Sequence, residues 1–135
     1  MNLNEKFVAI ISFCGGILGY LFGGLDILLN AFVITLIVDT LSGMMKSYIA
    51  GTYSSRLFRK GLSKKCGYML AVILAVQLDK LTGDTGALRG AMILFSLANE
   101  GTSIIENLGE VGIPFPAPIV NAIAALKKKS EDSDN

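Results

Sequence analysis

The sequence predicts an all-α integral membrane protein with about four transmembrane helices and a short amphipathic helix at the C-terminal end. Of its 135 residues, 52% are hydrophobic and 17% charged, which is more apolar than an ordinary soluble domain. Apolar runs long enough to cross the roughly 30 Å hydrocarbon layer of a bilayer recur along the chain. We expect a transmembrane helical domain over residues 1–116, followed by an amphipathic helix and charged tail over 117–135.

The first two apolar segments are the clearest candidates for membrane crossings. Residues 7–25 are nineteen positions without a charged side chain, long enough for a spanning helix. A secretory signal peptide is the alternative, but this run is long for one and lacks a small-x-small cleavage site. Residues 27–50 are interrupted only by Asp39 and Lys46. We therefore expect two crossings here.

A basic stretch over residues 51–65 follows the second segment. It contains no acidic residue, and its cations are Arg56, Arg59, Lys60, Lys64 and Lys65. Because Lys- and Arg-rich loops stay on the cytoplasmic side of a membrane, we expect a topology-setting cytoplasmic loop. Nucleic-acid binding is the alternative for such a cluster, but its place between two apolar segments favours the topological role.

The second half of the chain predicts two more crossings. Residues 62–81 have an uncharged centre of thirteen residues, which spans only if the flanking lysines extend to the interfaces. The fourth segment, 88–108, lies between a "TGDTG" turn and the proline-rich 114–118. Four crossings place the basic loop, the C-terminal lysines and both termini in the cytoplasm. Three crossings, with the fourth segment on the surface, would leave one basic cluster outside, so we prefer four.

Polar side chains share one face on each of two predicted spans. On the second span they are spaced i, i+3, i+4, i+7, and on the fourth they occupy one side of the helical wheel. The two sets are Asp39, Ser42, Gly43 and Lys46, and Asn99, Glu100, Ser103, Glu106 and Asn107. A charge near the membrane centre costs about 2.5 to 3.5 kcal/mol, so neither face is expected to contact lipid.

The depths of these polar groups match, because both helices run from outside to inside in the four-crossing layout. Asp39 then shares a layer with Asn99 and Glu100, and Lys46 can pair with Glu106. One cation faces three carboxylates, which favours an aqueous lumen formed between several copies. A structural ion pair inside a single bundle is the alternative.

Small residues and the absence of catalytic motifs complete the interpretation. Gly15, Gly19 and Gly23 form a small-x-x-x-small ladder, which serves either packing within one chain or contact between copies. Cys14 and Cys66 have no metal-ligand spacing, and free thiols are favoured over a disulfide. With no His, phosphate loop or nucleophile elbow, we expect neither an enzyme nor a cofactor. An acid–base pair of Glu100 and Glu106 would lack a nucleophile or metal.

Three motifs resemble the toxin-secretion and phage-lysis holins, also called holin family four. They are "DTLSGMMKSYIAGTYSS" from Asp39, "RKGLSKK" from Arg59 and "NEGTSIIENLGEVGIPFP" from Asn99, in that order. By this likeness the first motif positions are Asp39, Ser42, Gly43, Lys46, Gly51, Ser54, Ser55, Gly61 and Lys65. The last motif gives Asn99, Glu100, Gly101, Ser103, Ile104, Glu106, Asn107, Pro114 and Pro116.

The resemblance implies a protein that accumulates as small oligomers in the bacterial cytoplasmic membrane. It would then open lesions that release a cell-wall hydrolase or a large toxin. The expected partners are copies of the chain itself and the lipid bilayer, with a functional link to an endolysin or toxin and no nucleic acid. A small membrane channel or transporter subunit with a stable selective conduit is the alternative function.

Overall fold

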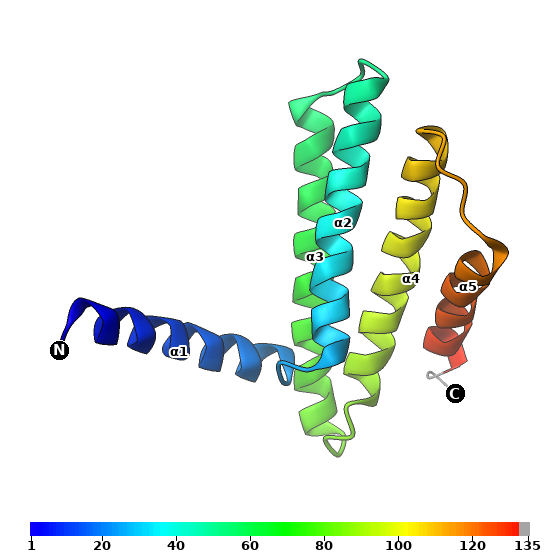
Figure 1. The fold of residues 1–135 in the computed structure, drawn as a ribbon. Coiled ribbons are helices and arrows are strands. Elements are labelled where there is room, and N and C mark those ends of the chain that lie inside the picture. Colours follow the sequence, from blue (N-terminus) through cyan, green and yellow to red (C-terminus); the bar gives the residue numbers. More distant parts are fainter. Residues whose placement is uncertain (133–135) are drawn as a thin grey trace.

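Five helices make up nearly all of the computed structural model, which describes residues 1–132. No strand occurs within that range. Helices α2, α3 and α4 lie side by side as an upright bundle, α1 projects sideways from one end of it, and α5 lies against α4 (Figure 1). The helices are α1 (Leu3–Phe22), α2 (Ile27–Ile49), α3 (Ser55–Leu81), α4 (Ala87–Glu110) and α5 (Ala117–Asp132). The predicted all-helical class is confirmed.

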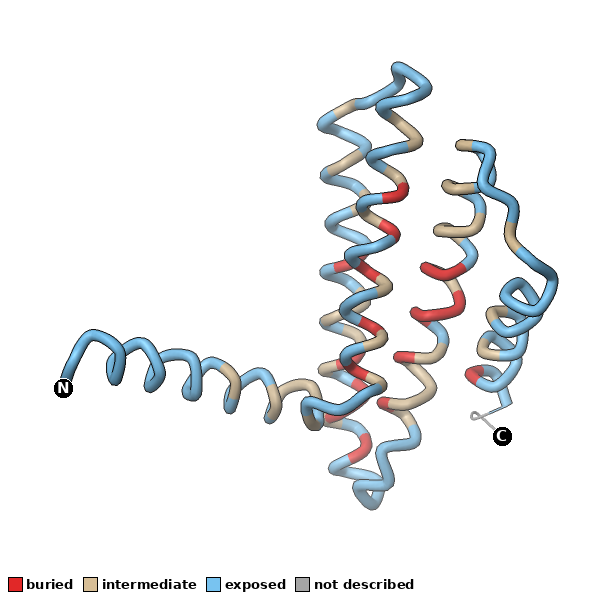
Figure 2. The backbone as a smooth tube through the Cα atoms, in the orientation of Figure 1, coloured by how far each residue is buried: buried red, intermediate tan, exposed pale blue. Residues whose placement is uncertain are grey.

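The core of the bundle lies between α2, α3 and α4. Apolar residues spaced three or four apart turn one stripe of each helix inward, as Figure 2 shows in red. Helix α4 packs extensively on α2 and less on α3, whereas α2 and α3 contact each other sparsely. The buried cluster comprises Leu29, Phe32, Leu36, Val72, Ile93 and Leu97. Helix α4 is therefore the element that joins the bundle.

Helix α1 has no buried residue, and most of its apolar side chains are exposed, although Phe22 in its last turn packs against the core of the bundle. It ends at Gly23, whose φ of +74° lies in the left-handed region. A side chain at Gly23 would also come within 3.0 Å of Arg89 Cδ. Glycine is therefore required at this junction for both its backbone conformation and its size.

Three helices, α1, α2 and α3, are long and apolar enough to cross a membrane. Helix α4 is long enough but more polar, since it carries Arg89 and three glutamates. The structure thus supports three of the four predicted crossings and does not confirm the fourth.

The prediction that residues 51–65 form a loop is wrong, because most of them are helical. Helix α3 begins at Ser55, with the Ser54 side chain accepting a hydrogen bond from the Arg56 amide at 3.3 Å. Arg and Lys are good helix formers, so a run of cations need not end a helix. Only a short turn separates α2 from α3, and most of the basic stretch forms the first three turns of α3.

Helix α5 folds back along α4 after the proline-rich turn (Figure 1). Gly101 permits this packing, because a Cβ atom there would lie 2.5 Å from Ile123 Cδ1. Near the end of α5, Ser130 and Glu131 line a groove together with Leu88 and Ala91 at the beginning of α4. The C-terminal lysines at 127–129 therefore lie toward the opposite end of the bundle from the basic first turns of α3, unlike the expected layout.

Candidate functional site

A buried ion network crosses the bundle at mid-height and joins all three of its helices. Lys65 of α3 lies at its centre, with Nζ 2.5 Å from Asp39 Oδ2 of α2 and 2.7 Å from Glu100 Oε2 of α4. Lys64 Nζ lies 3.1 Å from Glu100 Oε1 in an ion pair that lacks hydrogen-bond alignment. Only 1% of the Glu100 side chain is exposed. The network holds two carboxylates and two ammonium groups, so its charge is balanced.

An amide extends the network toward the α2–α3 turn. Asn107 Nδ2 donates to Asp39 Oδ1 at 3.3 Å and to Ser42 Oγ at 3.1 Å. Ser42 Oγ in turn donates to the Asp39 carbonyl at 3.0 Å. Gly43 gives Asn107 room, since a Cβ there would lie 3.5 Å from Asn107 Nδ2. The polar faces predicted on the second and fourth spans thus meet, as expected for Asp39 and Glu100.

The source of the balancing charge differs from the expectation. Sequence reasoning placed Lys64 and Lys65 where the basic loop meets the third span, with their side chains extending to the membrane interface, and left two carboxylates without a basic partner. Because α3 starts at Ser55, these lysines lie three turns inside a helix, and Lys65 points into the core with 10% of its side chain exposed. The single chain therefore satisfies these charges internally, as in the alternative of a structural ion pair. Separating such a pair is costly, because it leaves a buried charge unpaired.

Of the other predicted residues, one joins the network and the rest lie outside it. Ser103 is half-buried, and its side chain hydrogen-bonds Asp39. Lys46 pairs with Glu110 at 2.7 Å rather than with Glu106, which is exposed. Asn99 is half-buried. The remaining predicted cations of the basic stretch, Arg56, Arg59 and Lys60, are exposed.

Of the glycine ladder of α1, Gly23 packs against the bundle, whereas Gly15 and Gly19 have little to pack against in one chain. A Cβ at Gly15 would meet nothing within 4 Å, and one at Gly19 would meet only Leu25 Cγ at 3.7 Å. Cys14 and Cys66 are both free and exposed. Within residues 1–132, no group of three or more His, Cys, Asp or Glu side chains is placed to hold a metal ion.

A second polar cluster, at the α1 end of the bundle, was missed by sequence reasoning. Arg89 forms a bidentate ion pair with Asp26 at 2.8 and 3.0 Å and donates to the carbonyls of Phe22 and Gly24. Asp79 accepts from the Leu88 and Arg89 amides and so caps α4. Two signals in the sequence were available. Asp26 directly precedes the second apolar run, which is typical of a helix N-cap, and Arg89 is a lone cation at the start of the fourth apolar run.

This cluster also changes the acidity of Asp26. The hydrogen bond from Arg89 lowers the pKa of Asp26 from 3.8 to about 2, outweighing the opposite effect of burial. Lys80 adds a further contact at the same junction, with Nζ 3.9 Å from the centre of the Tyr20 ring. Arg89, Asp26 and Lys80 therefore fasten the end of α1 to the bundle.

The bacteriophage holin family model matches residues 16–128, which include both polar clusters. The chain belongs to the bacteriophage holin family. This membership points to a non-enzymatic lysis protein and, with three apolar helices long enough to span, to a membrane protein. The resemblance seen in the three sequence motifs is confirmed.

Relatives cover most of this holin-family chain. It is 32% identical over 112 residues to a probable holin of Bacillus phage phi105, covering 83% of this chain and 82% of the relative. It is 36% identical over 127 residues to the uncharacterized protein Lin0175 of Listeria innocua, covering 94% and 90%. It is also 34% identical over 116 residues to the uncharacterized protein YqxH of Bacillus subtilis, covering 86% and 82%. No solved structure matches the chain.

Proposed function

We propose that the chain is a holin whose copies associate in the bacterial cytoplasmic membrane and open a lesion that releases a cell-wall hydrolase or a large toxin. The observation that carries this proposal, beside the family membership, is the ion network at the centre of the bundle. In this network, α2 and α4 carry buried polar side chains that could line an aqueous opening if the helices separated. The bilayer and further copies of the chain are the partners, and nucleic acid is not.

The bundle as described is the closed form in this proposal. Lys65, Asp39 and Glu100 satisfy one another, and the apolar cluster fills the space beside them. Hydration of the polar faces requires α2, α3 and α4 to separate and to exchange these contacts for water and neighbouring copies. Contacts between copies offset the cost of breaking the buried ion pairs.

In the proposed topology, four helices cross the membrane and both termini are cytoplasmic. This topology requires α1 to swing about its junction at Gly23 from the sideways direction of Figure 1 until it runs alongside the bundle. Helix α4 is parallel to α2, and the Lys46–Glu110 ion pair keeps their ends level. If α2 crosses, α4 must therefore cross beside it. Its polar residues Glu100 and Asn107 face the bundle rather than lipid.

Helix α5 cannot remain on α4 in the membrane-embedded closed form. Its lysines at 127–129 would then lie level with the hydrocarbon layer, at about 2.5 to 3.5 kcal/mol for each charge near the centre. We place α5 at the cytoplasmic surface in that form, where its apolar side rests in the interface and its lysines in water.

The experiment that tests the function is lysis of Escherichia coli expressing the chain with and without a co-expressed phage endolysin. We expect an abrupt fall in turbidity only when both proteins are present, and escape of a folded cytoplasmic enzyme. Liposomes holding an ion-sensitive dye and a labelled protein of endolysin size should lose both. Release of ions alone, with sharp selectivity, would instead establish the stable channel.

A further inference from the structure

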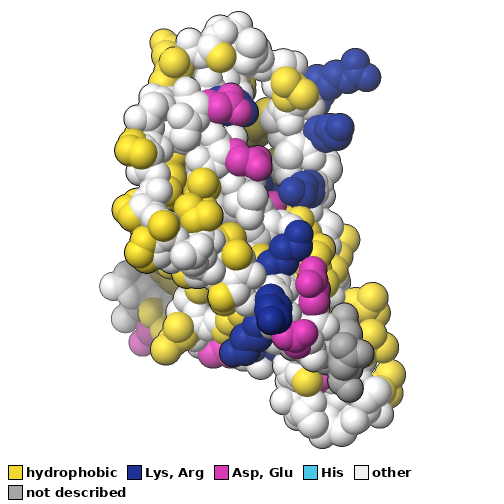
Figure 3. Space-filling view, turned by 90° about the vertical axis from the view of Figure 1, so that its right-hand side faces the viewer, with side chains coloured by type: hydrophobic (Ala, Val, Ile, Leu, Met, Phe, Trp, Pro, Cys, Tyr) yellow, Lys and Arg dark blue, Asp and Glu magenta, His cyan; other side chains and the backbone are white. Residues whose placement is uncertain are grey.

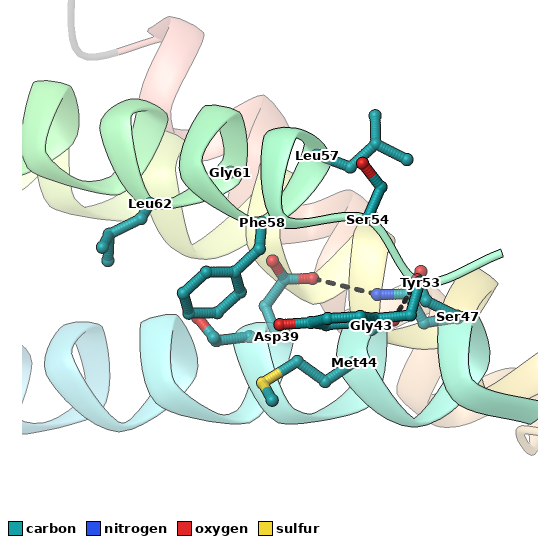
Figure 4. A pocket seen from close by; sticks show the side chains of 12 residues that line it. Asp39, Gly43, Met44, Ser47, Tyr53, Ser54, Leu57, Phe58, Gly61 and Leu62 are labelled. Carbon is teal, nitrogen blue, oxygen red and sulfur yellow. Dashed lines mark hydrogen bonds between the residues drawn. The ribbon is translucent and has the colours of Figure 1, made fainter.

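A pocket of about 160 Å³ opens between α2 and α3 beside the turn that joins them. Figure 4 looks into it between the two helices, with α4 behind, and shows the Phe58 ring in the space between them. Asp39, on α2, lies at its inner end. The lining includes Gly43, Met44, Tyr53, Phe58, Gly61 and Leu62. An apolar cavity of about 150 Å³ in another protein holds a benzene molecule, so this one accommodates a short stretch of hydrocarbon.

The pocket exists because α2 and α3 do not close on each other. Both are held mainly by α4, and each presents a glycine to the pocket, Gly43 and Gly61. A Cβ at Gly61 would meet no atom within 4 Å. In a bilayer, the side of this opening away from α4 faces lipid.

The carboxylate of the pocket and two of its hydroxyls are already engaged. Asp39 accepts from Lys65 and Asn107, and the Thr40 and Ser47 hydroxyls donate to carbonyls of their own helix. The side walls are mostly apolar and aromatic. This lining offers no unpaired charge to an ion and fits an uncharged apolar group.

Strong positive charge surrounds the same end of the bundle. The first turns of α3 carry Arg56, Arg59 and Lys60, all exposed, and residues 51–65 contain no acid. In Figure 3, Lys and Arg side chains form a column that begins at this end of the molecule and runs down most of its height. A ligand with an apolar chain and an anionic head would match both features.

We propose that this pocket binds one anionic phospholipid, with an acyl chain between α2 and α3 and its phosphate on the cations of the first turns of α3. The proposal rests on the membrane placement of these two helices and not on lesion formation. A bound chain excludes water from the Asp39 end of the ion network and favours the closed bundle.

Native mass spectrometry of the purified protein, titrated with phosphatidylglycerol or phosphatidylcholine, tests the proposal. We expect one tightly retained phosphatidylglycerol, bound about tenfold more strongly than phosphatidylcholine. Gly61→Leu should fill the pocket and reduce binding of both lipids. Gly67→Leu is the matched control, since Gly67 lies on the same helix, is exposed and is outside the pocket lining. Equal binding by Gly61→Leu and the native chain would overturn the proposal.

The headgroup contact is tested separately. Arg59→Gln with Lys60→Gln should remove the preference for phosphatidylglycerol, whereas Lys127→Gln with Lys128→Gln should leave it intact. Equal loss in both variants, or no preference in the native chain, would contradict an anionic headgroup site. A phosphatidylglycerol with a photoreactive chain should label Met44, Phe58 or Leu62 in the native protein. Labelling confined to α1 would exclude the pocket, and none of these results depends on lysis.

Discussion

Glu100 is held between two lysines of α3 with 1% of its side chain exposed. Replacement by Gln removes the charge that Lys64 and Lys65 face while nearly preserving the volume. Because Lys65 then remains in the core with one carboxylate in place of two, we expect Glu100→Gln to lower the free energy of unfolding by about 3 kcal/mol. Thermal or denaturant unfolding in detergent micelles measures this change.

Glu106→Gln is the matched control on the same helix. Glu106 is exposed, and surface substitutions usually change stability by less than about 0.5 kcal/mol. Equal destabilisation by the two variants would show that the ion network does not hold the bundle together. In the lysis assay, Glu100→Gln should also bring lysis forward, since less energy is needed to separate the helices.

Asp26 gives the junction of α1 with the bundle a defined pH dependence. Its pKa in the folded protein is lowered to about 2, so its ion pair with Arg89 stabilises fully above its ordinary pKa of 3.8. That contribution is lost as the pH falls through about 2. Asp26→Asn should therefore be less stable than the native chain at pH 6, and the difference should vanish near pH 2.

Asparagine is a good N-cap, so Asp26→Asn keeps the hydrogen bond to the Leu29 amide and removes only the charge. Melting temperatures of both proteins in micelles between pH 7 and pH 2 measure the effect. Asp84→Asn, in the exposed turn before α4, is the control for loss of a carboxylate elsewhere. A difference between native and Asp26→Asn that does not change with pH would contradict the assignment.

The placement of a side chain could be predicted from the sequence where it depends only on the periodicity of its own helix. The spacing of Asp39, Ser42 and Gly43 fixes a common face, and depth matching brought Asp39 and Glu100 together correctly. The role of Lys65 depends on where α3 begins and on which way its face turns in the bundle. The local charge pattern shows neither the start of α3 nor the direction of this face, so Lys64 and Lys65 were expected at the end of a loop.

Helix boundaries were predictable where composition changes sharply. The span expected at 27–50 is α2 (Ile27–Ile49), because an N-cap Asp and a glycine enclose an apolar run. The start of α3 was missed by seven residues, since Arg and Lys continue a helix as well as they populate a loop. A charge run indicates solvent or interface and says little about backbone conformation.

The contact between α4 and α5 depends on the smallness of Gly101. A leucine there must displace Ile123, whose Cδ1 would lie 2.5 Å from a new Cβ, so we expect a loss of about 1 to 3 kcal/mol in α5 docking. In detergent, trypsin should cut Gly101→Leu at the α5 lysines at least about fivefold faster than the native chain. Gly109→Leu, with nothing within 4 Å, should behave as native.

The same assay in liposomes tests whether α5 leaves α4 in a membrane. If it does, the native chain and Gly101→Leu should be cut at the same rapid rate from the side that corresponds to the cytoplasm. Native α5 that stays protected in liposomes would show that the hairpin survives in the bilayer. The four-crossing topology would then have to be abandoned, because the lysines could not lie in hydrocarbon.

At the scale of the whole molecule, the sequence indicates helices and their polarity but not their assembly. The fold-back of α5 and the sideways direction of α1 follow from contacts at Gly101 and Arg89, each made with a residue distant in sequence. Composition could not reveal that the polar faces satisfy one another within one chain. The charge-balanced bundle is thus a finding of the structure, and the proposed lesion requires it to open.

That requirement can be tested by locking α2 to α4. Gly43 and Asn107 are adjacent across the two helices, and Gly43→Cys with Asn107→Cys, in a chain whose native cysteines are replaced by Ser, introduces one bridgeable pair. In liposomes, the oxidised protein should retain a trapped protein of endolysin size, and reduction with a phosphine should restore release. Gly43→Cys alone should release its cargo under both conditions. Equal release from the oxidised and reduced double variant, with the disulfide verified by mass spectrometry, would show that the lesion forms without separation of α2 from α4. The lumen would then have to lie on the outer faces of intact bundles, where α1 and its unpacked glycines are exposed.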